Sequence, residues 1–265
     1  MLRLPPFRYL APTTVADAAA LLAEAPRETM IIAGGTDLVP NMKRRQQAPR
    51  TIVGLRQIPA LARVTHHEGG VTIGAMATLS ALAADARLRA RCPGLWQAIV
   101  QIATPHLRNM GTIGGNLCLD TRCTYYDQTE EWRRAIGYCM KKDGATCWVA
   151  TSSPKCLAVS STDTAPMLQA LDARVQLTSA AGARTVAVAD LYANDGMAYL
   201  TRRADEILTA IDIPVGPASP ERGREGGPAS PKRWKREGGS DFCDRVWWCL
   251  YVPMAAWPMQ SVPLF

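Results

Sequence analysis

Half of the eight cysteines in this chain of 265 residues fall in one segment near its middle, and no other stretch restricts the fold as strongly. Fifteen, seven and eight residues separate Cys123, Cys139, Cys147 and Cys156 in turn. Four thiolates are the number that completes a metal site. The segment also contains the turn-forming run Ser-Ser-Pro at 152–154. It is therefore expected to be a long irregular insertion, which in a compact domain either carries a function or is disordered.

Three chemistries compete for these sulfur atoms. The opening residues Met1–Phe7 show no apolar run and no cleavage motif, and no run of eighteen apolar residues follows, so a cytoplasmic protein without a membrane span is expected. Disulfides are not expected in a reducing compartment. Zinc sites usually contain paired C-x2-C knuckles, which this segment lacks, whereas iron-sulfur clusters accept wider spacing. The spacing favours a 4Fe-4S cluster and leaves zinc or four unrelated buried thiols open.

Composition and charge indicate a globular protein. The chain is 48% hydrophobic and 20% charged, and its length suits one large domain or two ordinary ones. The formal net charge of +7 is dispersed. Its densest basic clusters, 43–45 and 232–236, are not interleaved with aromatic residues as in single-strand binders. They are interpreted as solvated faces, so no nucleic-acid partner is predicted.

A glycine turn follows the first predicted strand. Residues 29–33 have the pattern of a short buried strand, and Gly34-Gly35-Thr36-Asp37 comes directly after it. A strand, a glycine turn and a helix start together point backbone N–H groups at an anion, and glycine lets the backbone approach a pyrophosphate closely. An ordinary β-turn before a helix is the alternative, and this loop alone does not exclude it.

A second glycine loop lies about seventy-five residues further on, at 111–118, with the sequence Gly-Thr-Ile-Gly-Gly-Asn-Leu-Cys. Thr112 and Asn116 could offer side-chain hydrogen bonds, and two such loops could hold the two ends of one dinucleotide. Neither loop matches G-x-G-x-x-G, which argues against a Rossmann nicotinamide site. Cys118 is interpreted as a packed apolar residue beside this loop.

The remaining patterns predict an α+β fold. Helices are expected from Thr14 to Ala25, over 79–89, over 95–103 and after Asp163; strands are expected at 51–55, 71–75, 174–178, 184–188 and 206–213. His66 and His67 are expected on the surface of a turn. Residues 214–265 are rich in Pro, Gly and Trp and fit neither a domain nor an ordinary disordered tail, so a truncated or out-of-frame ending is expected.

The two glycine loops resemble those of a known family. Ile-Ile-Ala-Gly-Gly-Thr-Asp-Leu at 31–38 is similar to the first FAD pyrophosphate loop in the flavoprotein subunits of molybdenum hydroxylases, and Thr-Ile-Gly-Gly-Asn at 112–116 is similar to the second. The resemblance covers roughly residues 1–213 and implies a two-subdomain FAD-binding fold. It implies flavin contacts at Ile31, Ile32, Ala33, Gly34, Gly35, Thr36, Asp37, Leu38, Ile102, Thr112, Ile113, Gly114, Gly115, Asn116 and Asp163.

This resemblance also implies a domain layout. FAD-binding subdomains are expected at 1–55 and 56–213, with an iron-sulfur insertion at 120–160 inside the second. The family's C-terminal domain, which helps to cover the flavin, has no recognisable counterpart in the tail at 214–265.

The cysteine segment resembles one branch of the family, the β subunits of 4-hydroxybenzoyl-CoA reductases. Cys123, Cys139, Cys147 and Cys156 match the four ligands of an extra 4Fe-4S cluster in that branch. The resemblance implies reductive dehydroxylation to benzoyl-CoA in anaerobic aromatic degradation. Electrons from ferredoxin would pass through the cluster and FAD to a 2Fe-2S small subunit and a molybdopterin-containing large subunit.

The expected role is electron transfer and not bond-making. No Ser-His-Asp set, carboxylate pair or Cys-His pair is recognisable, so no catalytic residue is assigned. Aromatic side chains at 125, 126, 132 and 148 either shield the cluster from water or simply pack the segment. Two other functions remain open: the FAD subunit of an oxidative hydroxylase that acts on xanthine, an aldehyde or CO, and a zinc-stabilised binding module without redox activity.

Overall fold

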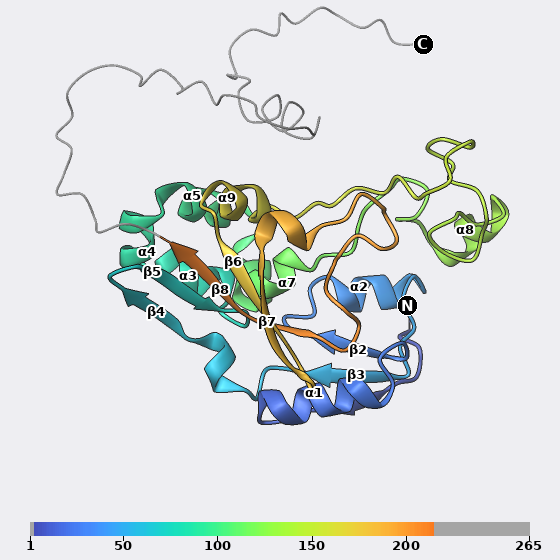
Figure 1. The fold of residues 1–265 in the computed structure, drawn as a ribbon. Coiled ribbons are helices and arrows are strands. Elements are labelled where there is room, and N and C mark those ends of the chain that lie inside the picture. Colours follow the sequence, from blue (N-terminus) through green and yellow to red (C-terminus); the bar gives the residue numbers. More distant parts are fainter. Residues whose placement is uncertain (1–2, 215–265) are drawn as a thin grey trace, which may run out of the picture. The chain divides into compact units, whose positions relative to one another are not determined.

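The computed structural model describes residues 3–214, which form two β-sheets with helices packed against them (Figure 1). The first sheet is parallel, with strand order β1-β3-β2. Its strands are β1 (Arg8–Leu10), β2 (Thr29–Ile32) and β3 (Thr51–Gly54). The second sheet is antiparallel, with order β4-β5-β8-β6-β7. Its strands are β4 (Val64–His67), β5 (Gly70–Gly74), β6 (Arg174–Ser179), β7 (Gly182–Ala187) and β8 (Ile207–Pro214). The predicted α+β class is confirmed.

Alternation along β3 explains how the small sheet is covered. Successive side chains of a strand point to opposite faces. Val53 packs in a cluster with α1 (Val15–Glu24), and Ile52 packs in a separate cluster with α2 (Leu38–Lys43). Helix α1 begins as the sequence predicts, because the Thr14 side chain accepts a hydrogen bond from the Asp17 N–H.

The larger core lies between the second sheet and a layer of short helices. Buried leucine, isoleucine and valine side chains from both layers form one continuous cluster. The helices of this half are α3 (Leu79–Ala84), α4 (Ala86–Arg91), α5 (Pro93–Gln101), α6 (Pro105–Met110), α7 (Ile113–Leu117) and α9 (Ala165–Ala170). Two 3-10 helices, η1 (Pro59–Ala62) and η2 (Val188–Leu191), complete it.

Three local predictions in this half were wrong. The expected helix over 79–89 is divided at Asp85, whose carboxylate accepts hydrogen bonds from Arg87 and Leu88 N–H and so starts α4. The expected loop at 111–118 contains the short helix α7. His66 and His67 lie in β4 and not in a turn. His67 is exposed as expected, whereas the His66 side chain is only 11% exposed and its Nε2 lies 2.9 Å from Asp85 Oδ2.

The cysteine segment leaves the fold and returns to it at one place. Arg122 and Val159 exchange backbone hydrogen bonds of 2.7 and 2.9 Å, which close the base of the segment like the end of a hairpin. Beyond this base the chain forms turns and the helix α8 (Glu130–Ala135), and Figure 1 shows the segment extending past the two sheets. The insertion therefore stands on a closed stem.

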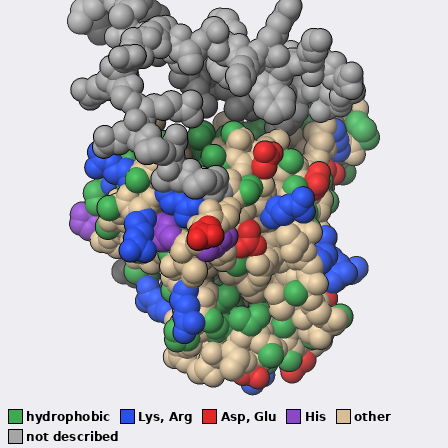
Figure 2. Space-filling model, turned by 60° about the vertical axis from the view of Figure 1, so that its left-hand side comes forward, with side chains coloured by type: hydrophobic (Ala, Val, Ile, Leu, Met, Phe, Trp, Pro, Cys, Tyr) green, Lys and Arg blue, Asp and Glu red, His purple; other side chains and the backbone are tan. Residues whose placement is uncertain are grey.

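The surface carries no single continuous field of charge on the face shown in Figure 2. Basic side chains there are interspersed with acidic, histidine and hydrophobic ones. Among residues 3–214, no helix is both long and apolar enough to cross a membrane. The predicted anomalous tail at 214–265 lies outside the described residues from residue 215 onward.

Candidate functional site: two adjoining cavities

A cavity of about 760 Å³ lies where the two glycine loops meet. This volume is typical of sites that enclose a cofactor. The cavity is lined by the turn after β2, by the segment around α6 and α7, and by residues close to β8. We call it the flavin cavity, after the cofactor that the sequence predicts.

The first loop presents unpaired backbone N–H groups. Gly35 has a φ of +75°, a conformation that glycine adopts without strain. Within the described chain, the amides of residues 34–38 have no hydrogen-bond acceptor. All five residues line the cavity. Successive free amides next to a helix start form a binding site for an anion, so this loop suits the pyrophosphate of a dinucleotide.

The second loop differs from the prediction, because its polar groups hold the protein together. Thr112 Oγ1 accepts a hydrogen bond from Gly115 N–H at 3.1 Å, and Gly114 N–H donates to Ala75 O at 2.9 Å. Asn116 Oδ1 accepts from the Thr164 hydroxyl at 2.7 Å. The loop therefore forms a fixed wall of the cavity, and its glycines let neighbouring backbone approach.

The glycines also bring the two loops together. A Cβ atom at Gly34 would lie 1.9 Å from the carbonyl oxygen of Met110, just before the second loop. A Cβ atom at Gly114 would lie 2.7 Å from Ala75 Cβ. Glycine is thus required at Gly34, where the backbones of the two loops meet, and at Gly114, where the second loop packs against Ala75.

Most residues predicted to contact flavin line this cavity. Those that do are Ile31, Ala33, Gly34, Gly35, Thr36, Asp37, Leu38, Ile102, Thr112, Gly114, Gly115, Asn116 and Asp163. Ile32 and Ile113 do not line it: Ile32 packs beside the α2 cluster and Ile113 lies in the main core. Asp163 accepts a hydrogen bond from Asn116 Nδ2 at 3.1 Å, so it also holds the second loop in place.

Several lining residues escaped the sequence analysis. Arg27, Arg108, Arg122 and Arg202 bring positive charge to the cavity, and Tyr199 brings an aromatic ring. Arg108 lies in α6 and the others lie outside the helices and strands, with no shared motif, so only the fold brings them together. Such cations would complement the phosphates of a dinucleotide.

Asp37 joins the first loop to the stem of the cysteine segment. Its carboxylate pairs with the Arg122 guanidinium and accepts a hydrogen bond from Asp120 N–H at 3.1 Å. Burial raises the pKa of Asp37 above its ordinary value, and the Arg122 charge offsets only part of that rise. The first glycine loop and the cysteine segment are therefore joined by a polar contact.

The four predicted ligand cysteines line a second, smaller cavity, which we call the cysteine cavity. Cys139, Cys147 and Cys156 are buried, Cys123 is half-buried, and none of the four forms a disulfide. The cavity holds about 10 Å³, roughly the space of one water molecule. In the described part of the chain, no three His, Cys, Asp or Glu side chains are arranged to hold one metal ion.

Polar and aromatic groups surround these thiols. Burial would raise the pKa of Cys147, but backbone amides of Leu157, Ala150 and Val149 lower it below its ordinary value. Tyr125, Tyr126 and Trp148 line the cavity; the fourth predicted aromatic, Trp132, instead lies with its ring centroid 6.5 Å from that of Tyr125.

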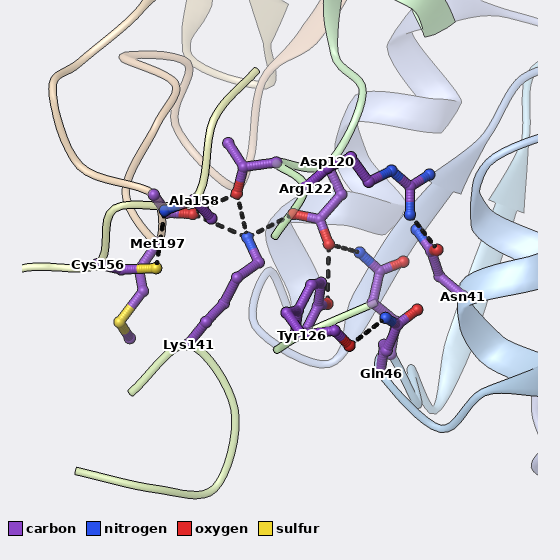
Figure 3. A network of polar contacts seen from close by, with 12 residues as sticks. Asn41, Gln46, Asp120, Arg122, Tyr126, Lys141, Cys156, Ala158 and Met197 are labelled. Carbon is purple, nitrogen blue, oxygen red and sulfur yellow. Dashed lines mark hydrogen bonds and ion pairs between the residues drawn. The ribbon is translucent and has the colours of Figure 1, made fainter. Parts of the chain in front are cut away.

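A buried polar network lies between the two cavities (Figure 3). Lys141 Nζ is 2.7 Å from Asp120 Oδ1, and the Tyr126 hydroxyl donates to Asp120 Oδ2 at 2.8 Å. Asp120 lines the flavin cavity, whereas Lys141 and Tyr126 line the cysteine cavity. The two cavities thus adjoin through direct side-chain contacts.

Comparison with known proteins identifies the family. The model of the FAD binding domain in molybdopterin dehydrogenase matches residues 5–216, which is most of the chain and includes both loops. The chain belongs to this family. The "Carbon monoxide dehydrogenase medium chain" of Afipia carboxidovorans is 33% identical over 211 residues, or 80% of this chain and 59% of that one. The "Nicotine 6-hydroxylase medium subunit" of Paenarthrobacter nicotinovorans is 29% identical over 216 residues, or 82% of this chain and 62% of that one.

Solved structures agree with this assignment. The reconstituted CO dehydrogenase from Oligotropha carboxidovorans has a chain that superposes with a TM-score of 0.62 at 32% identity, covering 82% of this chain and 62% of that one. The predicted FAD-binding fold is therefore confirmed. This FAD-binding domain spans about 59% of the length of the carbon monoxide dehydrogenase medium chain. The subdomain boundary predicted at residues 55 and 56 stays a prediction.

Proposed function

We propose that this chain is the FAD-carrying electron-transfer subunit of a molybdenum hydroxylase-type enzyme, and that its cysteine segment holds a 4Fe-4S cluster. The observation that carries this proposal is the meeting of Cys123, Cys139, Cys147 and Cys156 at one cavity that adjoins the flavin cavity. The sulfurs come from four different turns of the insertion. Their meeting at one cavity is what a site shared by four thiolates requires.

The donor set suits a cluster better than zinc. Zinc sites usually contain cysteines in paired C-x2-C knuckles, and the gaps between these four cysteines are all longer than that. A cluster is larger and receives each thiolate at a different corner. To admit it, the cysteine cavity must widen. The insertion allows this because only 130–135 within it are helical.

Each part of this chain has a defined task in such a subunit. The free amides of residues 34–38 would hold the pyrophosphate of FAD. The second loop would form the fixed wall beside the flavin. The backbone amides around Cys147 would hydrogen-bond to cluster sulfur and tune its potential. FAD supplies one- and two-electron chemistry, so it can connect one-electron centres to a two-electron reaction.

The proposed enzyme is 4-hydroxybenzoyl-CoA reductase, on the strength of the four-cysteine segment. Electrons from ferredoxin would enter at the cysteine segment and continue through FAD. They would then pass to a 2Fe-2S small subunit and a molybdopterin-containing large subunit, where benzoyl-CoA forms. Both partner subunits and ferredoxin belong to the proposal.

The second candidate is the FAD subunit of an oxidative hydroxylase. It is favoured by the similarity to the carbon monoxide dehydrogenase medium chain and the nicotine 6-hydroxylase medium subunit. In that case the cysteines would hold no iron. The two candidates share the flavin and differ in the cysteine cavity.

Anaerobic purification of the full chain tests the proposal, with analysis of iron, acid-labile sulfide, zinc and FAD. We expect iron and sulfide in equal amounts, and a brown absorbance that dithionite bleaches. Cys147→Ser should lose most of the iron, whereas Cys92→Ala, at a buried thiol of the main core, should keep it. Flavin without iron would support the oxidative candidate. A colourless protein with stoichiometric zinc would refute both.

A further inference from the structure

A buried ion pair joins the two cavities, and the function proposed above gives it no role. The side chains of Lys141 and Asp120 are each 7% exposed. Lys141 lines the cysteine cavity and Asp120 lines the flavin cavity. The pair is therefore a fixed dipole, with its positive end at the thiols and its negative end at the flavin cavity.

The surroundings hold this dipole in one orientation. The Lys141 ammonium donates to Asp120, to Thr121 Oγ1 and to Gly196 O, the last at 2.8 Å. Its three donors are thus all used. The ammonium also lies 4.9 Å from the ring centroid of Tyr126 and 5.3 Å from that of Tyr199. Tyr126 belongs to the cysteine cavity and Tyr199 to the flavin cavity, so the charge is fixed between them.

We propose that the Asp120–Lys141 pair sets the difference in reduction potential between the cysteine cavity and the flavin cavity. This inference rests on the proposed function, because it needs a redox group in each cavity. Accepting one electron adds one negative charge to a group, and a nearby buried cation stabilises that charge while an anion opposes it. Lys141 therefore raises the potential at the thiols more than at the flavin. Asp120 lowers the potential at the flavin more than at the thiols.

The transfer itself leaves the pair unchanged. With a redox group in each cavity, one electron would leave the group held by the four cysteines and enter the one held in the flavin cavity. No bond of Lys141 or Asp120 would form or break. The dipole holds the electron on the cysteine side, so the two residues are positioning residues that act on the redox groups through their charge.

Two variants test this in the full chain, one that removes the positive charge of the pair and one that removes the negative charge. Lys141→Met should lower the reduction potential of the cluster more than that of the flavin. Asp120→Asn should raise the reduction potential of the flavin more than that of the cluster. Each should move the one-electron distribution between the groups toward the flavin by roughly tenfold, which is 59 mV for one electron. Potentials are read by redox titration, with absorbance for the flavin and electron paramagnetic resonance for the cluster.

Three further proteins separate charge from structure. The double variant Lys141→Met with Asp120→Asn leaves no unpaired charge, and it should show the largest shift toward the flavin. Lys141→Arg keeps the charge and should keep both potentials. Lys142→Met removes the neighbouring lysine, whose side chain is 35% exposed and screened by water, and should change neither potential.

The outcomes separate a failure of this inference from a failure of the proposed function. A wild-type chain without iron and sulfide overturns both. The inference alone is overturned if wild type and variants carry both groups but the two single variants do not both shift the difference between the two potentials toward the flavin. It is supported if both single variants shift this difference toward the flavin and their shifts add in the double variant.

Discussion

Substituting Gly34 by alanine tests whether contact between the two glycine loops forms the flavin cavity. The new Cβ atom would lie 1.9 Å from Met110 O and 2.7 Å from Met110 C. Real Cβ contacts are essentially never shorter than 3.0 Å, so backbone must move by more than 1 Å. That backbone is held on both sides, because Gly111 N–H donates to Leu107 O at 2.7 Å and Gly111 O accepts from Leu79 N–H at 2.9 Å.

The cost of this movement follows from overpacking a close contact. We expect Gly34→Ala to lower the free energy of unfolding by about 3 kcal/mol. The displacement also separates the free amides from the opposite wall, so FAD affinity should fall at least about tenfold. Urea unfolding followed by circular dichroism measures the first effect, and quenching of FAD fluorescence measures the second.

Gly69→Ala is the matched control. Its Cβ atom would lie 3.6 Å from the nearest side-chain atom, an ordinary contact, so its stability should stay within about 0.5 kcal/mol of wild type. If Gly34→Ala unfolds at the same urea concentration as Gly69→Ala and binds FAD equally well, loop contact does not form the cavity.

Three further predictions concern stability. Thr14→Ala removes the N-cap of α1 and should cost about 1 kcal/mol in urea unfolding, whereas Thr14→Ser should not. Asn116→Leu leaves Thr164 without its acceptor and should cost about 3 kcal/mol; a loss below about 1 kcal/mol would contradict the role given to this wall. Hydrogen bonding from Arg184 lowers the pKa of Glu206 below its ordinary 4.5, so this carboxylate stabilises the fold above pH 4.5 and that contribution is lost as the pH falls through the lowered pKa. Glu206→Gln should therefore show a shallower loss of stability below pH 4.5 than wild type, and equal slopes would count against the ion pair.

Local sequence patterns predicted much of the fold. The strands at 29–33, 51–55 and 71–75 were each placed to within about one residue, because short apolar runs bounded by glycine specify a strand without help from elsewhere. The Thr14 cap was also correct, because its hydrogen bond spans only three residues. All the residues that produce such a signal lie close together in the sequence, so it can be recognised without the structure.

Features that depend on distant contacts were missed. β1 is three residues long and forms only because it pairs with β3. Asp85 interrupts a helical pattern, and its partner His66 lies in β4, nineteen residues earlier. The residue types in the second loop were found, but not that Asn116 would bond to the 162–164 turn. In each case the deciding partner lies in another element.

The site shows the same division. Glycine loops and cysteines are recognisable from residue type and spacing. The Asp120–Lys141 pair has no such signature, because an aspartate and a lysine twenty-one residues apart in an irregular segment are unremarkable until turns bring them together.

Because its stem is closed at Arg122 and Val159, the cysteine segment could be removed from the chain as one piece. The chain enters and leaves at adjacent backbone positions, so joining them by a tight turn would require no rearrangement of either sheet. Removing the segment at this point would leave the strands of both sheets in place and take away the whole lining of the cysteine cavity, which lies within 123–158.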